Sequence, residues 1–237
     1  EAYGLQILID LHTAPLGQNG FDNGGICGVC KWAQHPEEVE FILSVLERLA
    51  KRYGNRKGLW GIEVINEPLT ENMWDSMNMQ ERYPAFDPEM AEGSAPVTFA
   101  FLKEFYKDAY DRIREYMPEE KYVVIHDGFA IKEWKGYMQE EKYKIPGDMS
   151  VIGCDNIIFS GMSHLSLTTI EHFVPLKGRD ACDIIIRKIK SSKDTYDGTN
   201  PISIYHIEYE PKLIARKTTS YAREKRTKEA GKKRNIK

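Results

Sequence analysis

Short apolar runs recur along the chain, and each of them ends in polar residues. The first run, residues 5–12, is nearly continuous in Leu and Ile, which is typical of a parallel strand covered on both faces. Three further runs predict strands over 59–65, 122–126 and 156–160. A fifth candidate strand covers 201–210. Because amphipathic helical stretches lie between the runs, the pattern predicts an α/β protein.

The clearest helix is predicted over residues 36–53. Proline stands at its first position, acidic residues come early and basic residues late, and apolar side chains form one stripe. Gly54 is expected to end this helix. Further helical patterns cover 97–116 and 181–189, whereas the run 73–94, rich in Met, Asp, Glu and Pro, predicts an irregular excursion.

Polar groups follow the carboxyl end of every predicted strand. In parallel α/β folds the ligand site is built from these positions. The spacing between the strands is too wide for a compact Rossmann sheet, but it suits a barrel with long loops. No glycine-rich nucleotide-binding pattern is present in the sequence. The strand pattern therefore favours a TIM (β/α)8 barrel.

Composition and charge narrow the classes of function. The 237 residues are 41% hydrophobic and 29% charged, and no apolar run approaches the roughly 18 residues of a membrane span. Residues 1–211 hold 22 basic and 34 acidic residues, whereas residues 212–237 hold 11 basic and two acidic residues. The acidic body argues against nucleic acid. We expect 1–211 to form one domain and 212–237 a solvated basic tail, disordered or helical, with a nucleic-acid or membrane-surface arm as the alternative.

The chain begins at Glu1, almost directly on the first predicted strand, and no secretory leader is recognised. We therefore expect that residues upstream of it are missing.

The four cysteines are too few for a disulfide scaffold. Cys27 and Cys30 have the spacing of a redox dithiol or of half a zinc site. They lie in a glycine-rich loop without the strand and helix of a redox motif, and Cys154 and Cys182 are 28 residues apart rather than a second close pair. A structural or incidental role is favoured, and a dithiol oxidoreductase is a poorer alternative.

The strongest chemical signal is Asn66-Glu67-Pro68, directly after the second predicted strand. It sets a carboxyl group at a strand end, with an amide beside it and a proline that fixes the turn. A retaining glycosidase needs a carboxyl group that protonates the leaving oxygen and a second carboxylate about 5–5.5 Å away. Glu67 is the candidate acid/base, and an ordinary strand-to-loop turn is the alternative.

Three motifs, IDLHTAP, QNGFDN and GIEVINEP, together resemble glycoside hydrolase family 5, and most closely its exo-β-1,3-glucanase-like branch. The resemblance implies that Glu67 is the general acid/base and that His12 and Asn66 lie in the active site. Asn66 would hydrogen-bond the sugar 2-hydroxyl, and His12 would bind a neighbouring hydroxyl.

The same resemblance covers residues 4–138 and assigns further contacts with sugar. It implies that Phe21 and Asp22 shape the sugar subsites. The segment VVIHDGF resembles the family's fifth strand, which makes Phe129 a candidate for stacking on a sugar.

Beyond residue 145 the resemblance fades. The family has His-x-Tyr after its sixth strand, where this chain offers His164 without the tyrosine. It has Gly-Glu after its seventh strand, where this chain has PISIYHIEYEP. Glu208 is the predicted nucleophile, and a solvated charge on an edge segment is the alternative.

Several other titratable residues are given structural roles. Asp10 shares a strand face with His12, so it is expected to orient the histidine ring or to cap a neighbouring loop. Glu63 lies within the second predicted strand and is expected to be an internal hydrogen-bond partner. His126 and His172 are expected to be structural.

These observations predict strands three to seven of a TIM barrel from a retaining hydrolase that cleaves β-1,3- or β-1,4-glucan by double displacement. The partner would be a β-glucan oligosaccharide or polysaccharide, no metal or organic cofactor is implied, and we expect a monomer. The family mostly acts outside the cell or at its surface. The alternative is a catalytically inactive, carbohydrate-binding remnant, because an incomplete barrel leaves open sheet edges.

Overall fold

The computed structural model of the chain describes residues 3–192 and 206–221, and it divides into two compact units. The described part of the first unit covers residues 3–140, and the second unit is Glu141–Tyr221. Each unit contains a three-stranded sheet of its own. The domain boundary expected at residue 211 therefore does not coincide with the division between the units.

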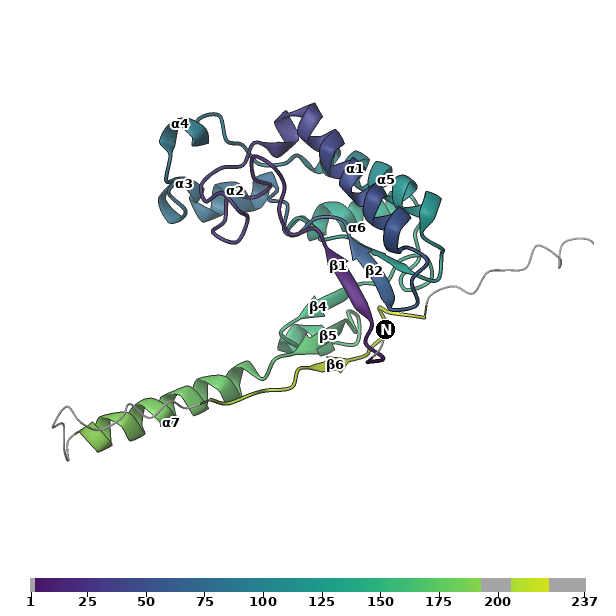
Figure 1. Cartoon of the computed structure of the whole chain (residues 1–237). Coiled ribbons are helices and arrows are strands. Elements are labelled where there is room, and N and C mark those ends of the chain that lie inside the picture. The colour runs from purple at the N-terminus through teal and green to yellow at the C-terminus, as the bar shows by residue number, and fades with distance from the viewer. Residues whose placement is uncertain (1–2, 193–205, 222–237) are drawn as a thin grey trace, which may run out of the picture. The chain divides into compact units, whose positions relative to one another are not determined.

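The first unit alternates strands with helices (Figure 1). Its elements are, in chain order, β1 (Ile7–Asp10), η1 (Trp32–Gln34), α1 (Pro36–Tyr53), β2 (Leu59–Glu63), α2 (Glu71–Met77), α3 (Met79–Arg82), α4 (Pro88–Ala91), α5 (Phe99–Tyr116), β3 (Tyr122–Val124) and α6 (Ile131–Glu140). The segment expected to be irregular thus contains three short helices, α2, α3 and α4.

The sheet of the first unit is parallel, with strand order β1-β2-β3. Asp10, Glu63 and Val124 lie in one row across it, so the three strands end at nearly the same level. The predicted α/β class with a parallel sheet is confirmed.

The helices α1 and α5 lie side by side (Figure 1) and share one core with the sheet. Leu46 of α1, Ile62 of β2 and Ile113 of α5 are all 0% exposed. The sequence signals of α1 hold in the structure, because Pro36 stands at its first position and it ends at Gly54 as predicted. The N-cap of α5 is Thr98, whose hydroxyl accepts a 3.1 Å hydrogen bond from the amide of Phe101.

The prediction that the first strand is covered on both faces is wrong. Ile7 and Leu8 are 53% and 39% exposed. Within residues 3–192 and 206–221, β1 is an edge strand that pairs only with β2, whereas β2 lies in the middle of the sheet and buries Ile62 and Leu59. A run of Leu and Ile alone does not distinguish an edge strand from a central one.

The second unit contains a mixed sheet with strand order β4-β5-β6. The strands β4 and β5 are parallel, and β5 and β6 are antiparallel. Its elements are β4 (Ile152–Cys154), η2 (Ile158–Gly161), β5 (Thr168–Glu171), α7 (Val174–Ser192) and β6 (Lys212–Ile214). The helix predicted over 181–189 is thus confirmed as part of α7.

Two predicted strands in this unit have different outcomes, one wrong and one only partly described. The run 156–160 contains the start of the 3-10 helix η2 instead of a strand, and the neighbouring strands are β4 and β5. Of the candidate strand 201–210, residues 201–205 lie outside the described residues, and 206–210 have no regular structure.

The predicted basic tail begins inside the second unit. Lys212 opens β6, and the Arg216 guanidinium donates to the Leu167 carbonyl at 2.6 Å and to Asn156 Oδ1 at 2.7 Å. Residues 212–221 are therefore part of the folded unit, because β6 and Arg216 complete its hydrogen bonding.

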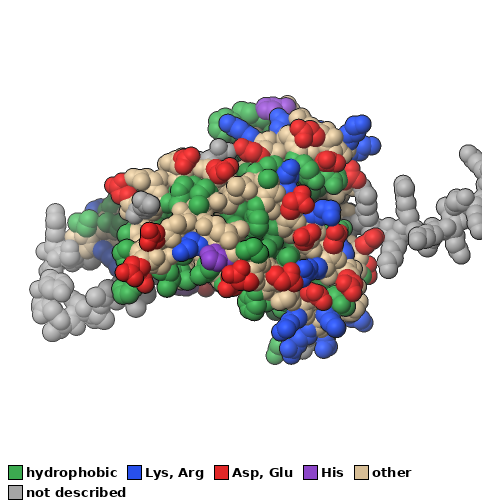
Figure 2. Space-filling view, turned by 90° about the horizontal axis from the view of Figure 1, so that it is seen from above, with side chains coloured by type: hydrophobic (Ala, Val, Ile, Leu, Met, Phe, Trp, Pro, Cys, Tyr) green, Lys and Arg blue, Asp and Glu red, His purple; other side chains and the backbone are tan. Residues whose placement is uncertain are grey.

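Acidic side chains are distributed over the face seen in Figure 2, with Lys and Arg between them. This distribution agrees with the excess of acidic residues in 1–211. None of the helices in the described part of the chain is both long enough and apolar enough to span a membrane.

Candidate active site

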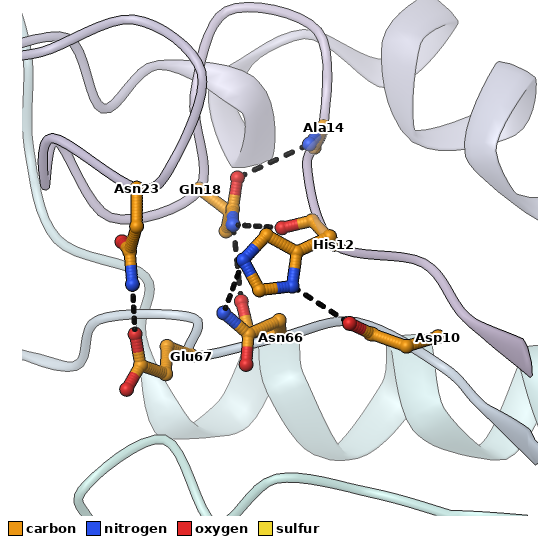
Figure 3. Close-up of polar contacts among 7 residues, drawn as sticks. All are labelled: Asp10, His12, Ala14, Gln18, Asn23, Asn66 and Glu67. Atoms are coloured by element: carbon orange, nitrogen blue, oxygen red, sulfur yellow. Dashed lines mark hydrogen bonds and ion pairs between the residues drawn. The ribbon is translucent and has the colours of Figure 1, made fainter. Parts of the chain in front are cut away.

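The candidate site lies where β1 and β2 end beside each other. Asp10 pairs with Glu63 in the sheet, and the Leu11 amide then donates to the Glu63 carbonyl at 3.3 Å. The Asn66 amide donates in turn to the Leu11 carbonyl at 3.1 Å. These bonds continue the pairing past the strand ends and bring His12 and Asn66 together (Figure 3).

Asp10, His12 and Asn66 form a row of polar side chains (Figure 3). The Nδ1 of His12 lies 2.7 Å from Asp10 Oδ2, and its Nε2 lies 3.5 Å from the amide nitrogen of Asn66. Asp10 thus fixes the Nδ1 side of the imidazole ring, and the Nε2 side faces Asn66. Of the two roles open to Asp10, the structure supports orientation of the histidine ring.

Gln18 connects the segments that follow the two strands. Its side-chain amide donates to the carbonyls of His12 at 2.9 Å and Asn66 at 3.0 Å, and its Oε1 accepts from the Ala14 amide at 3.1 Å. The Gln18 carbonyl also accepts from the Leu69 amide at 3.1 Å. Gln18 is 0% exposed, so this buried amide has its hydrogen bonds satisfied by backbone groups of the site.

Glu67 follows this row on the turn after β2. Its backbone has a φ of 45°, a left-handed conformation that costs a residue with a side chain about 1–3 kcal/mol and is common at functional sites. Asn23 donates from Nδ2 to Glu67 Oε2 at 3.0 Å (Figure 3). The carboxylate is partly buried, and its orientation is set by a side chain from a different loop.

An open cleft of about 290 Å³ lies beside the Glu67 carboxylate. The Phe21 ring is 7% exposed and packs 5.1 Å from the Tyr83 ring and 6.2 Å from the Phe129 ring, measured between centroids. Aromatic rings, two carboxylates and an amide therefore meet at one opening. The cleft is lined by Phe21, Asp22, Asn23, Glu67, Met73, Met77, Tyr83 and Phe129.

Glu63, which pairs with Asp10 at the end of β2, has a raised pKa. Partial burial raises the pKa of Glu63, the negative charges of Asp10 and Glu67 raise it further, and His12 opposes these effects. The neutral form of the Glu63 carboxyl is therefore favoured over a wider pH range than for an exposed glutamate. Less negative charge then faces Asp10 and Glu67.

His126 lies at the end of the third strand of the same sheet. Burial lowers the pKa of His126, while the charges of Asp127 and Glu67 act in the opposite direction. Its Nδ1 accepts from the Gly128 amide at 3.0 Å, and its ring packs edge-on 5.0 Å from the Phe129 ring. These contacts fit the structural role predicted for this histidine, since they position Phe129 at the cleft.

Six of the eight predicted site residues lie in the first unit. Four of them line the cleft, namely Phe21, Asp22, Glu67 and Phe129. The other two, His12 and Asn66, lie in the polar row beside Glu67. Glu208 and His164 belong to the second unit. The Glu208 side chain is 86% exposed and pairs with His206 at 2.8 Å, and His164 is exposed.

Sequence reasoning missed Gln18, Asn23 and Tyr83. Gln18 and Asn23 lie within the QNGFDN motif, which was the available signal, but nothing in the motif shows which of its side chains turn inward. Tyr83 comes from the segment expected to be irregular, where no pattern marks it.

The cysteine pair does not suit redox chemistry. Cys30 is buried, and burial raises its pKa to about 12, so the thiol stays protonated near neutral pH. Cys27 and Cys30 are both free thiols. This finding favours the structural role over the dithiol alternative.

Comparison with known proteins gives two results for different parts of the chain. The family model described as "Periplasmic binding protein-like domain" matches residues 75–219, and the chain therefore belongs to this family. The match covers the second unit up to residue 219 and extends into the first.

The curated relatives are glycosidases by name. The chain is 32% identical over 143 residues to the probable glucan 1,3-beta-glucosidase A of Emericella nidulans, which covers 60% of this chain and 29% of that protein. It is 33% identical to the glucan 1,3-beta-glucosidase of Candida oleophila, over 57% of this chain and 28% of the relative. The glucan 1,3-beta-glucosidase 2 of Candida albicans is 30% identical, over 61% of this chain and 27% of the relative. The chain thus spans less than a third of the length of these relatives.

Among solved structures, the rutinosidase from Aspergillus niger is similar with a TM-score of 0.42 and 17% identity. This similarity covers 64% of this chain and 39% of the rutinosidase chain.

Proposed function

We propose that the first unit carries the acid/base part of a β-glucan hydrolase site, with Glu67 as the proton donor. The observation that carries this proposal is the position of Glu67, at the end of a parallel strand, beside the row of Asp10, His12 and Asn66 and facing the cleft. The curated relatives named glucan 1,3-beta-glucosidase support a glucan as the substrate class.

The side chains at the cleft suit a sugar. A pyranose has an apolar face that stacks on aromatic rings, and Phe129 and Tyr83 supply such rings at the opening. Its hydroxyl groups need donors and acceptors, which Asn66 and His12 supply. In this proposal, the Asn66 amide binds the 2-hydroxyl and His12 a neighbouring one.

The proposed mechanism is the double displacement of a retaining glycosidase. Glu67 protonates the glycosidic oxygen while a second carboxylate attacks the anomeric carbon, and Glu67 then deprotonates the water that releases the sugar. Glu208 is kept as the predicted nucleophile. Its exposed position in the second unit fits the alternative equally well, in which it is a solvated charge.

In this proposal the sheet β1-β2-β3 corresponds to strands three to five of a (β/α)8 barrel of glycoside hydrolase family 5. Its parallel strands and the polar residues at their carboxyl ends support the assignment.

The direct test is release of reducing sugar from β-1,3- and β-1,4-glucans by the full chain. We expect Glu67→Gln to lower the rate by about 10²–10⁴-fold, which is the usual contribution of a general acid/base. The matched control is Glu119→Gln, an exposed glutamate between α5 and β3, which should leave the rate unchanged.

Substitution of Glu208 tests whether this residue is the nucleophile. If the chain is active, Glu208→Gln should abolish release of sugar, whereas full activity of this variant would show that another group attacks. If the folded wild-type chain releases no sugar but binds glucan oligosaccharides in calorimetry, the inactive, carbohydrate-binding alternative is correct.

A second candidate function, ligand binding by the second unit, is favoured by the family match over residues 75–219. The probe is a glucan oligosaccharide, the substrate class that the names of the curated relatives support. If the second unit binds it, the oligosaccharide should raise the melting temperature equally in wild type and in Glu67→Gln. Scanning calorimetry measures this shift, and a shift that Glu67→Gln abolishes would place the ligand in the first unit.

A further inference from the structure

The second unit brings a thiol and an imidazole together at the ends of two parallel strands. Cys154 is the last residue of β4 and pairs with Ile170 of β5. His172 follows Ile170 by two residues, so it lies on the same face of the sheet as Cys154. The Cys154 Sγ and His172 Nε2 are 3.1 Å apart.

Asp155 adds a carboxylate to this pair. One oxygen of Asp155, the Cys154 Sγ and a ring nitrogen of His172 all lie within 4.8 Å of one another. Cys154 and Asp155 are exposed, and His172 is partly buried. The three groups therefore converge at a position that solvent reaches.

The neighbouring carboxylate of Glu171 has other partners. It accepts hydrogen bonds from Asn156 Nδ2 at 2.8 Å and from the Phe173 amide at 2.6 Å. Because side chains alternate along a strand, Glu171 lies on the opposite face from His172. The converging set is thus one sulfur, one nitrogen and one oxygen donor.

This donor set matches the preferences of Zn²⁺. With Zn–S of about 2.3 Å and Zn–N of about 2.0–2.1 Å, a tetrahedral ion holds these two atoms about 3.5 Å apart. The observed 3.1 Å needs only a small movement of the side chains. Thiolate and imidazole disfavour Mg²⁺ and Ca²⁺, which take oxygen ligands.

We propose that Cys154, Asp155 and His172 bind a Zn²⁺ ion, with water as the fourth ligand. The ion links the adjacent ends of β4 and β5. Because the ion binds the folded unit in preference to the unfolded chain, its binding also stabilises the second unit. The site is separate from the glucan site proposed for the first unit, so either proposal can fail without the other.

The test titrates the full chain with Co²⁺, which replaces Zn²⁺ and gives a charge-transfer absorption when a thiolate is bound. We expect one equivalent of Co²⁺ to produce this absorption and Zn²⁺ to displace it. Cys154→Ser should remove the absorption. The matched control is Cys182→Ser, an exposed free cysteine on α7 of the same unit, which should leave it unchanged.

Two further variants separate a metal site from a lone reactive thiol. His172→Gln and Asp155→Asn should each weaken Co²⁺ binding at least about tenfold, since even outer-shell substitutions cost that much. Circular dichroism of the metal-free variants checks that they fold. The proposal is overturned if the wild-type chain shows no thiolate absorption, if only Cys154→Ser changes it, or if Cys182→Ser removes it.

Discussion

Gln18 is the residue that holds the two strand ends of the candidate site together. Its buried amide satisfies two carbonyls and one backbone amide. Each buried group left without a partner costs about 1–3 kcal/mol. We therefore expect Gln18→Leu to lower the free energy of unfolding of the first unit by about 3 kcal/mol, measured by urea denaturation.

The control for this prediction is Gln34→Leu. Gln34 is exposed, and its side-chain amide donates a hydrogen bond to the Gly93 carbonyl at 3.0 Å. Its loss should cost about 0.5 kcal/mol. Equal effects of the two substitutions would contradict the role of Gln18.

Because the pKa of Glu63 is raised, we expect the free energy of unfolding of the first unit to depend on pH. Its pKa is raised in the folded state, mainly by burial, so the folded protein binds a proton more tightly than the unfolded chain. Stability that depends on Glu63 therefore falls as the pH rises from the ordinary value of 4.5 through the raised value. We expect Glu63→Gln to stabilise the first unit more at pH 7 than at pH 4, measured by thermal unfolding.

Glu40→Gln is the control, because the pKa of Glu40 is shifted in the opposite direction to that of Glu63. The hydrogen bonds from Arg112 lower the pKa of Glu40, so its contribution is present above the ordinary value and is lost as the pH falls. Glu40 is exposed and Arg112 is partly buried, and we expect only a small loss of stability at pH 7. The same pH profile for both variants would argue against the burial of Glu63.

At the scale of elements, β6 and the segment after it complete the second unit. The Arg216 guanidinium donates to the Leu167 carbonyl, to Asn156 Oδ1 and to Ser160 Oγ, with the last at 3.3 Å. Hydrogen bonds of charged groups contribute about 1.5–3 kcal/mol. We expect Arg216→Met to lower the stability of the second unit by about that amount.

Hydrogen exchange of the Thr168 and Thr169 amides in β5 measures this effect. The matched control is Lys217→Met, because Lys217 is the exposed neighbour of Arg216. Faster exchange in both variants, or in neither, would contradict the prediction that Arg216 stabilises the second unit.

Some strands could be predicted from the local pattern of apolar residues, and others could not. The runs that became β1, β2 and β3 were predicted correctly, because an apolar run between turn residues is a local property. The run 156–160 has the same local pattern, which predicts a strand, yet its last three residues begin the 3-10 helix η2. Strand formation there depends on a pairing partner, and the pairing in this unit goes to β4, β5 and β6.

For the whole molecule, the division after residue 140 predicts where a protease cuts. Residues 141–145, which follow α6, are exposed and outside regular structure. We expect trypsin at low concentration to cleave after Lys142 or Lys144 before it cleaves after Lys51, which is exposed but lies within α1. Mass spectrometry of the first fragments measures the order, and early cleavage at Lys51 would contradict two compact units.

Part of the candidate site could be predicted from the sequence, and part of it could not. The proximity of His12 to Asn66 and Glu67 could be predicted, because residues directly after parallel strands meet at one edge of a sheet. Their roles in catalysis and binding stay predictions. Gln18 could not be assigned a role, because its partners His12 and Asn66 belong to different segments of the chain and meet only in the folded unit.

Local sequence patterns are enough to predict the α/β class, the helix over 36–53 and the polar residues at the strand ends, since periodicity and helix capping act between neighbours in the chain. Three contacts could be found only in the folded units: Gln18 joins two strand ends, Arg216 bonds to Leu167 and Asn156, and Cys154 meets His172 across 18 residues. Each of these contacts depends on which strands pair. Strand pairing is set by the packing of the whole unit and leaves no local pattern in the sequence.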